Sequence, residues 1–454
     1  MGPLGRYGIA AVLLDEDTTD RFFAFDPIQD PGIAAFVVRH KFDCRHRSSS
    51  VQNRINGAHK HCSSVRNKDR PPYFQLQSFS LWTAAISNDA PLAYLLAQAR
   101  RFADAVAAEA ATTDRMAIIP DGIWMAFEAS GLGTCALPTE FGGCDLWEVS
   151  QGETLCSIMR MLGAADLSIA RLFEGHVNAI GLVCRYGTDE QIADLAEDVA
   201  AGALSAVWGA DDAIGLKAAK GEGSTVLQGR KILASGAGFV TRPLVTASGP
   251  DGQQMYLLEL APGYPQDISG WQSQGMRATA TGTVDFTGTV VGARERIGAP
   301  GDYMRQPTFS GGAWRFCAAH LGATERLVDL FRQHLVATKR GEDAYQLERL
   351  AHCVVAARTA RFWVEDAARR LAGTGDAAET VAITHLTRMT VERSALTVME
   401  TVQRGIGLRA FVRPHDAERI SRDLATYLRQ PAPDLAMSDA ARSFLSASGS
   451  VGDL

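Results

Sequence analysis

Two short strings in the C-terminal half of the chain place arginine beside glycine: Lys339-Arg340-Gly341 and Arg404-Gly405-Ile406-Gly407. A guanidinium pairs with phosphate oxygens through two parallel hydrogen bonds, and glycine lets backbone amides approach an anion closely. A simple helix stop is the alternative explanation for the second string, because it follows a long helical pattern. By residue type alone, the two strings are candidates for contacting a phosphate group.

Histidine and cysteine are the other reactive side chains, and their spacing does not predict a metal site. The group His59, His61 and Cys62 fits no zinc-finger spacing, and no Cys-x-x-Cys pair occurs. Eight scattered cysteines are typical of free thiols in a reducing compartment, so we expect a cytoplasmic protein.

The composition excludes several classes of protein. The 454 residues carry a net charge of −6, so neither nucleic acid nor an anionic membrane surface is expected as the main partner. No apolar run reaches the roughly 18 to 20 residues of a membrane span. Residues 1–78 are expected to be a poorly ordered leader, or an upstream start that does not belong to the working protein.

Three regions of different periodicity follow the leader. Residues 79–203 have the 3.6-residue spacing of amphipathic helices, and residues 204–300 contain short β-branched runs separated by Gly, Pro and Asp. Residues 301–454 return to helical spacing and predict a four-helix bundle. The predicted fold class is therefore α+β, with an N-terminal helical domain, a small central β-barrel or sandwich domain and a C-terminal bundle. The predicted helices are 90–106, 123–130, 148–162, 165–186, 189–200, 314–338, 344–372, 377–404 and 417–428, and the predicted strands are 226–233, 245–247, 255–260 and 283–291.

Three strings occur in a fixed order along these regions. Residues 135–143 read CALPTEFGG, residues 227–236 read LQGRKILASG, and residues 275–291 read GMRATATGTVDFTGTVV. With this order of elements, the chain resembles the acyl-CoA dehydrogenase superfamily over roughly residues 80–430. The resemblance implies that FAD lies between the β domain and the two helical domains.

The resemblance also implies which residues contact the flavin. Ser235 takes the place of the hydroxyl residue that hydrogen-bonds flavin N5, Leu233 replaces a tryptophan beside the ring, and Trp208 stands where a flavin-contacting threonine is expected. A turn serine and a core aromatic are the alternatives for Ser235 and Trp208. The residues that would bind the pyrophosphate and adenine come from the neighbouring subunit in this family, which implies a homodimer or homotetramer; they are Arg340, Arg404, Gly405 and Gly407.

The chain departs from the family where a dehydrogenase carries its catalytic glutamate, the base that removes the α-proton. Pro431 stands at one of the two positions used in the family, and Trp314 stands at the other. A branch of flavin-dependent monooxygenases, fed with reduced flavin by a reductase, also lacks this glutamate. His176 is the candidate catalytic imidazole, with a packed histidine as the alternative. Arg422 and Asp423 are candidates to order the same pocket, or else form an ion network within their helix.

The leading hypothesis is an FAD-dependent oxidoreductase that acts on the CH–CH group of an acyl thioester or related small molecule. It would pass electrons to an acceptor flavoprotein and would lack the usual glutamate. The first alternative is the reductase-fed monooxygenase. The second is a degenerate, non-catalytic binding subunit whose flavin site is eroded by the short loop 208–213.

Overall fold

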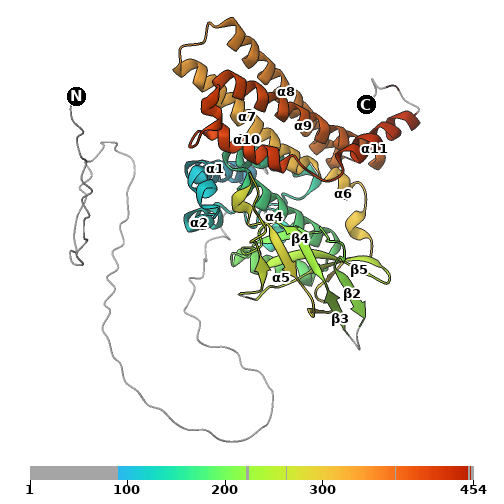
Figure 1. Ribbon diagram of the computed structural model, residues 1–454. Helices are drawn as coiled ribbons and strands as arrows, with labels where there is room; N and C mark the ends of the chain where they lie inside the picture. The colour runs from blue at the N-terminus through green and yellow to red at the C-terminus, as the bar shows by residue number, and fades with distance from the viewer. Residues whose placement is uncertain (1–89, 221–223, 262, 374, 448–449, 451–454) are drawn as a thin grey trace, which may run out of the picture. The chain divides into compact units, whose positions relative to one another are not determined.

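Figure 1 shows the computed structural model, which describes residues 90–220, 224–261, 263–373, 375–447 and 450. The predicted leader, 1–78, lies outside the described residues. So does the group of His59, His61 and Cys62.

The first helical region begins where the sequence predicts it. Its helices are α1 (Ala90–Met116), α2 (Asp121–Ser130), α3 (Gly152–Ala165), α4 (Leu167–Tyr186) and α5 (Asp189–Ala200). The α2 helix ends at Gly131, whose φ of 72° no longer fits a right-handed helix. The α4 helix begins at Asp166, whose side chain accepts hydrogen bonds from the amides of Ser168 and Ile169 at 2.7 and 3.2 Å. The predicted helices are thus confirmed, although α3 begins four residues later than expected.

The strands form two sheets in the described part of the chain. They are β1 (Ser205–Trp208), β2 (Lys217–Lys220), β3 (Thr225–Gln228), β4 (Arg230–Ala234), β5 (Arg242–Gly249), β6 (Gly252–Leu257), β7 (Gln266–Asp267), β8 (Gly282–Asp285), β9 (Val290–Val291) and β10 (Arg296–Ile297). The larger sheet has the order β10-β6-β5-β2-β3-β9, with β1 added parallel to β5, and the smaller one has the order β4-β8-β7.

The predicted strand 226–233 is in fact two strands in different sheets. Gly229 separates β3 from β4 with a φ of 111°, and a Cβ there would lie 2.4 Å from the carbonyl oxygen of Gly215. Only glycine fits such a close turn. The predicted strand 283–291 also divides, into β8 and β9, around Gly288 with a φ of 87°.

The C-terminal region is helical, as predicted, but it contains one more long helix than expected. The helices are α6 (Thr308–Gly311), α7 (Trp314–Ala337), α8 (Ala344–Ala372), α9 (Ala377–Ile406), α10 (Asp416–Tyr427) and α11 (Pro433–Ser446). The α11 helix was not predicted. Its Pro433 occupies the first turn, where a missing amide hydrogen breaks no helical bond, so the proline starts this helix.

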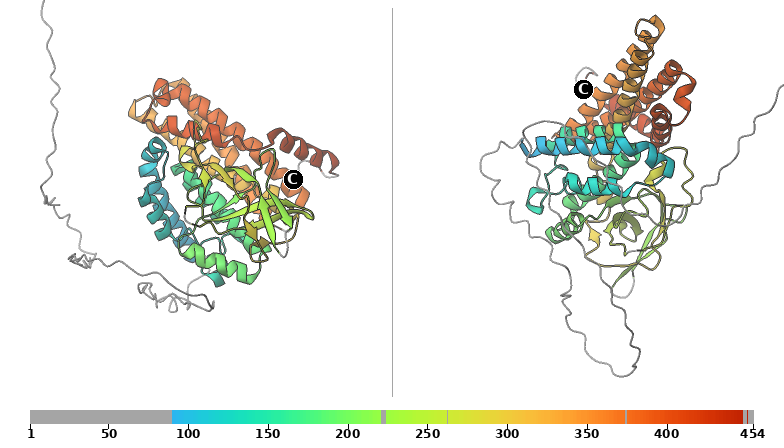
Figure 2. Two further views of the ribbon diagram at one scale, coloured as in Figure 1. Left: turned by 60° about the horizontal axis from the view of Figure 1, so that its bottom comes forward. Right: turned by 90° about the vertical axis from the view of Figure 1, so that its left-hand side faces the viewer.

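The α4 helix is the element that the other layers share. It packs on β1 and also on α3, α7 and α10, and Figures 1 and 2 show it between the strands and the C-terminal helices. It is buried on all sides, including Phe173, Glu174, Gly175 and His176. A helix that is covered all round belongs to the interior, so its polar residues need partners or a cavity. Among the described residues, no helix combines the length and apolar character needed to cross a membrane.

Candidate functional site

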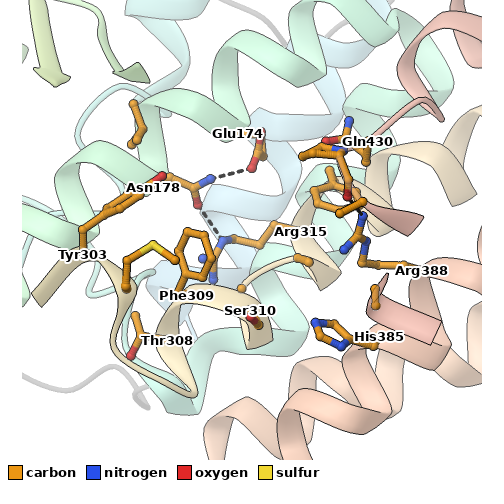
Figure 3. Close-up of a pocket in the computed structure, with 18 of the residues that line it drawn as sticks. Glu174, Asn178, Tyr303, Thr308, Phe309, Ser310, Arg315, His385, Arg388 and Gln430 are labelled. Carbon is orange, nitrogen blue, oxygen red and sulfur yellow. Dashed lines mark hydrogen bonds between the residues drawn. The ribbon is translucent and has the colours of Figure 1, made fainter. Parts of the chain in front are cut away.

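A cavity of about 620 Å³ lies between α4, the segment 302–313 before α7, helix α9 and the start of α11 (Figure 3). Val207 of β1 brings the larger sheet to its edge. The polar side chains that line it are Arg171, Glu174, Asn178, Tyr303, Gln306, Thr308, Ser310, Arg315, His385, Arg388, Gln430 and Asp439. Apolar side chains, among them Phe309, Phe316 and Leu435, complete the wall.

A chain of hydrogen bonds crosses the cavity from α4 to α7 (Figure 3). Arg171 donates to Glu174 Oε2, and Asn178 Nδ2 donates to Glu174 Oε1 at 2.5 Å. Asn178 Oδ1 in turn accepts from Arg315 Nε at 2.6 Å. The three α4 residues are spaced three and four apart and therefore share one face of the helix. Both oxygens of Glu174 are engaged by this chain.

Arg315, in the first turn of α7, is 7% exposed and forms no ion pair with any described residue. Its guanidinium lies over the Trp147 ring, with 4.3 Å between Cζ and the ring centroid, which is a cation–π arrangement. Burial lowers the pKa of Arg315 to about 10. The side chain therefore stays charged at neutral pH.

Arg388 and His385, one turn apart on α9, line the opposite side of the cavity (Figure 3). Arg388 Nη2 donates to the carbonyl oxygen of Pro431 at 2.8 Å, while its Nε is buried without a partner. His385 Nδ1 is also buried without a partner, and burial lowers the pKa of this imidazole. Pro431 lines the cavity beside them.

Three of the predicted flavin-contacting residues lie together at the ends of β1 and β4. Trp208 is 2% exposed, and its Nε1 donates to the carbonyl oxygen of Ser235 at 2.9 Å. The Ser235 hydroxyl accepts from Thr281 Oγ1 at 3.3 Å, which leaves its own hydrogen free to donate. Leu233 is 62% exposed. The Trp208 ring thus lies buried behind Leu233 and Ser235, and these two residues are the more exposed members of the group.

The backbone around Ser235 is strained. Leu233, Met276 and Ala280 have φ values of 51°, 57° and 43°, in the left-handed region that non-glycine residues avoid. Leu233 lies where the register of β4 against β8 shifts. Met276 and Ala280 flank the short turn whose Thr279 carbonyl accepts from the amide of Gly236. Such strain is concentrated at ligand sites more often than elsewhere.

His176 lies in the core rather than in the cavity lining. It is 0% exposed, its Nε2 lies 2.7 Å from the carbonyl oxygen of Gly133, and its Nδ1 accepts from the amide of Ser205 at 3.0 Å. Burial lowers the pKa of His176 to about 4, so the ring is neutral with its proton on Nε2. In this position the imidazole joins α4 to β1 and to the loop after α2.

The four predicted nucleotide-binding residues lie at the other end of α7. Arg340 follows α7 and pairs with Asp343 at 2.7 Å. Gly405 is buried, and a Cβ there would lie 2.4 Å from the Phe331 ring, so bundle packing alone requires this glycine. Gly407 ends α9 with a φ of 81°, and Arg404 is exposed in the last turn of α9. Because α7 starts beside the cavity and is 24 residues long, this group lies about 36 Å along the helix from it.

Arg422 and Asp423 do not line the cavity; they join three regions of the chain. Arg422 pairs with Asp114 of α1 at 2.8 Å, and also with Glu418. Asp423 Oδ1 accepts from the Met276 amide at 2.6 Å. A Cβ on the preceding Gly275 would lie 2.2 Å from the Arg422 carbonyl oxygen, which explains the glycine of the GMR string. The predicted ion network therefore exists, but it crosses between domains instead of staying within one helix.

The sequence analysis did not predict the charged cavity residues Glu174, Arg315 and Arg388, among other residues of the lining. Glu174 stands two positions before the candidate His176 in the string FEGH, and Arg315 directly follows Trp314 in the string GAWR. A lone arginine on a long helix such as α9 carries no sequence signal of its own.

The comparisons with known proteins agree with this architecture. Residues 93–203 match the family model of the acyl-CoA dehydrogenase N-terminal domain. A search of curated protein sequences found no match. Butyryl-CoA dehydrogenase from Megasphaera elsdenii superposes with a TM-score of 0.69 at 17% identity, covering 80% of this chain and 99% of that chain.

A monooxygenase and an FMN-bound protein also superpose over most of the chain. Methanesulfinate monooxygenase MsuC from Pseudomonas fluorescens has a TM-score of 0.69 at 21% identity, covering 78% of this chain and 98% of that chain. TdsC from Paenibacillus sp. A11-2, in a complex with FMN and indole, has a TM-score of 0.64 at 21% identity, covering 77% and 97%. The chain therefore has the fold of the acyl-CoA dehydrogenase superfamily, and its first helical region also matches the N-terminal domain of that superfamily in sequence.

Proposed function

We propose that the protein is a flavin-dependent oxidoreductase whose substrate lies in the cavity between α4, α7 and α9, and that it performs an oxygen-using monooxygenase reaction. The observation that carries this choice is that the carboxylates lining the cavity are already hydrogen-bonded or paired with arginine. Dehydrogenation of an acyl thioester needs a carboxylate that can take the α-proton. Glu174 has both oxygens hydrogen-bonded, and Asp439 pairs with Arg442. The sequence resemblance expects the base at Pro431, whose side chain cannot take a proton.

Leu233 and Ser235 fit the flavin ring best. An exposed leucine can cover one ring face, and a serine hydroxyl with a free hydrogen can donate to a ring nitrogen. Trp208 would hold Ser235 in place through the carbonyl oxygen of that residue. Reduced flavin, when bound, supplies the electrons for activating molecular oxygen. A flavin reductase is the partner that this reaction requires.

The identity of the flavin depends on the distant group at the ends of α7 and α9. FAD would need Arg340, Arg404, Gly405 and Gly407 of a second copy. Within one copy, these residues lie at the end of α7 that is remote from the cavity. FMN has no adenosine half and needs no such contribution. We propose FAD in a homodimer or homotetramer, with Arg404 as the exposed guanidinium nearest to the glycines.

Dehydrogenation of a CH–CH group is the second candidate, because the cavity does contain a carboxylate. Glu174 would then have to exchange Arg171 or Asn178 for the substrate proton. A non-catalytic binding subunit has less support, since the short loop after β1 is held firmly: Lys231 is 0% exposed and donates to Asp211 at 2.6 Å.

Two measurements on the purified full chain test the proposal. The absorbance of bound flavin after gel filtration, with FAD and FMN added in parallel, reports whether a flavin is retained and which one. Anaerobic addition of acyl-CoA thioesters should leave an oxidised flavin unbleached, whereas reduced flavin with oxygen should yield an oxygenated product. Bleaching by an acyl-CoA would favour dehydrogenation instead, and a protein that retains neither flavin would contradict both reactions.

The catalytic role proposed for His176 is tested separately. If His176→Ala lowers the turnover number per flavin-loaded molecule by ~10²-fold, that result would support the catalytic role. Because both ring nitrogens bond to the backbone, we expect the variant to lose stability and to keep its turnover per folded molecule. Thermal unfolding measured beside turnover separates the two effects.

A further inference from the structure

Arg315 is a charged group of the cavity that forms no ion pair with a carboxylate of the described residues. The side chain is 7% exposed, and its one hydrogen bond among the described residues joins Nε to Asn178 Oδ1. Its two terminal nitrogens have no hydrogen-bond acceptor in the described part of the chain. The indole of Trp147 supports the guanidinium from one side, so its direction is fixed. A buried guanidinium held in place with its two outer donors free is arranged to receive an anion.

Arg388 adds a second uncompensated charge on the facing wall. It forms no ion pair with a described residue, its Nε is buried without a partner, and it donates through Nη2 only to the Pro431 carbonyl oxygen. Figure 3 shows the side chains of Arg315 and Arg388 lining the same cavity, with Ser310 below Arg315. Two residues that are 73 positions apart in the sequence thus supply positive charge to one space.

The acidic residues that line the cavity form ion pairs with other arginines, although Glu174 acts on Arg315 from a longer distance. Glu174 pairs with Arg171, and Asp439 pairs with Arg442. Arg315 and Arg388 therefore keep a net positive charge in a space whose remaining walls include Phe309 and the other apolar side chains named above. A ligand that completes this site has an oxyanion at one end and an apolar body at the other.

We propose that the cavity binds a small organic acid, whose carboxylate or similar oxyanion pairs with the guanidinium of Arg315, supported by Arg388, and whose carbon skeleton lies against Phe309 and Phe316. This inference rests on the proposed function, because it assigns the substrate class of the same cavity. It also distinguishes this chain from an enzyme that recognises only a neutral acyl group there.

Calorimetric titration of the full-length protein tests the proposal without turnover. The probes are straight-chain carboxylates of two to eight carbons, each paired with its amide, which has nearly the same shape and no charge. A charge-assisted hydrogen bond contributes enough that the best carboxylate should bind about ten- to a hundredfold more tightly than its amide. Arg315→Gln should remove most of this preference, whereas Arg332→Gln, an exposed arginine on the same helix, should keep it.

The comparison of each acid with its amide uses the wild-type protein, so it tests the inference even if Arg315→Gln does not fold. Arg388→Gln is the second variant, and it should weaken carboxylate binding more than amide binding. Equal affinity of every acid and its amide would overturn the inference, as would an undiminished preference in a folded Arg315→Gln protein. Retained flavin without carboxylate preference would overturn only this inference. Carboxylate preference without retained flavin would support it and contradict the proposed reaction.

Discussion

Arginines are buried both between α1, α4 and α10 and in the cavity, and their neighbours differ in these two regions. Between α1, α4 and α10, Arg422 is 10% exposed and pairs with Asp114, while Arg419 is 7% exposed and lies 3.5 Å from Asp166. In the cavity, Arg315 is buried to the same degree, yet no described carboxylate pairs with it. In the first region the acids pair with the buried guanidiniums, whereas the cavity acids Glu174 and Asp439 pair with Arg171 and Arg442 instead of Arg315.

The difference indicates two uses of the same side chain. A buried charge with its partners in place joins elements, and removing one partner leaves the other uncompensated. A buried charge without a partner lowers the stability of the folded chain until a ligand supplies the missing anion. The first region therefore holds the GMR turn and α10 against the N-terminal helices, whereas the second prepares a binding site.

The largest expected effect comes from breaking the paired region. Arg422→Met leaves Asp114 without its guanidinium partner and removes the closer of the two arginines that pair with Glu418, so we expect the free energy of unfolding to fall by about 3–5 kcal/mol. Urea unfolding followed by circular dichroism measures it. Arg332→Met, at an exposed ion pair on α7, is the control and should change little. Equal effects of the two variants would contradict the distinction between the regions.

A smaller effect should depend on pH. Burial and the neighbouring Asp166 raise the pKa of Asp423 to about 7, above the value of an unfolded aspartate. A raised pKa means that this group stabilises the folded chain fully at low pH, and that the contribution disappears as the pH rises through 7. Between pH 5 and pH 8, Asp423→Asn should therefore gain about 2 kcal/mol relative to the wild type.

The control for this prediction is internal, since buried His176 titrates in both proteins and its effect cancels in the difference. The amide of asparagine can still accept from the Met276 amide, as Asp423 does. A difference between variant and wild type that stays constant with pH would show that Asp423 is ionised in the folded protein throughout this range.

The smallest expected change in stability is in the cavity. Arg315→Met replaces an uncompensated charge by an apolar side chain of similar length, so the free energy of unfolding should stay within about 1 kcal/mol of the wild type or rise. The same urea experiment measures it, with Arg422→Met as the contrasting variant. A loss as large as that of Arg422→Met would assign Arg315 to the structure instead of the ligand.

The spacing of apolar residues, together with capping, glycine and proline residues, predicted most of the fold. The bounds of α5 and α8 agree with the predicted segments, because Thr188 and Asp343 cap their first turns and polar or glycine residues end them. The extra strands and α11 were missed for a local reason. Strands of two to four residues have no usable period, and the prolines before α11 resemble the end of a helix although Pro433 begins one.

The candidate site was less predictable than the fold. The neighbourhood of Trp208, Leu233 and Ser235 followed from a resemblance of short strings, and in the structure the three lie side by side. His176 and Glu174 stand two positions apart on α4 and thus point to different sides of the helix. Nothing in the string FEGH shows which of these sides meets a cavity, because α4 is covered on all of them.

The sequence by itself determined the order of helices, strands and helices, since local spacing and glycine or proline positions control where each element begins and ends. Only the tertiary structure decided which charges remain without a partner. Arg422 meets Asp114 across 308 positions, whereas Arg315 meets Asn178 and no acid. The energy of a buried charge depends on the groups within a few ångströms in space, and the order of residues along the chain does not contain those distances.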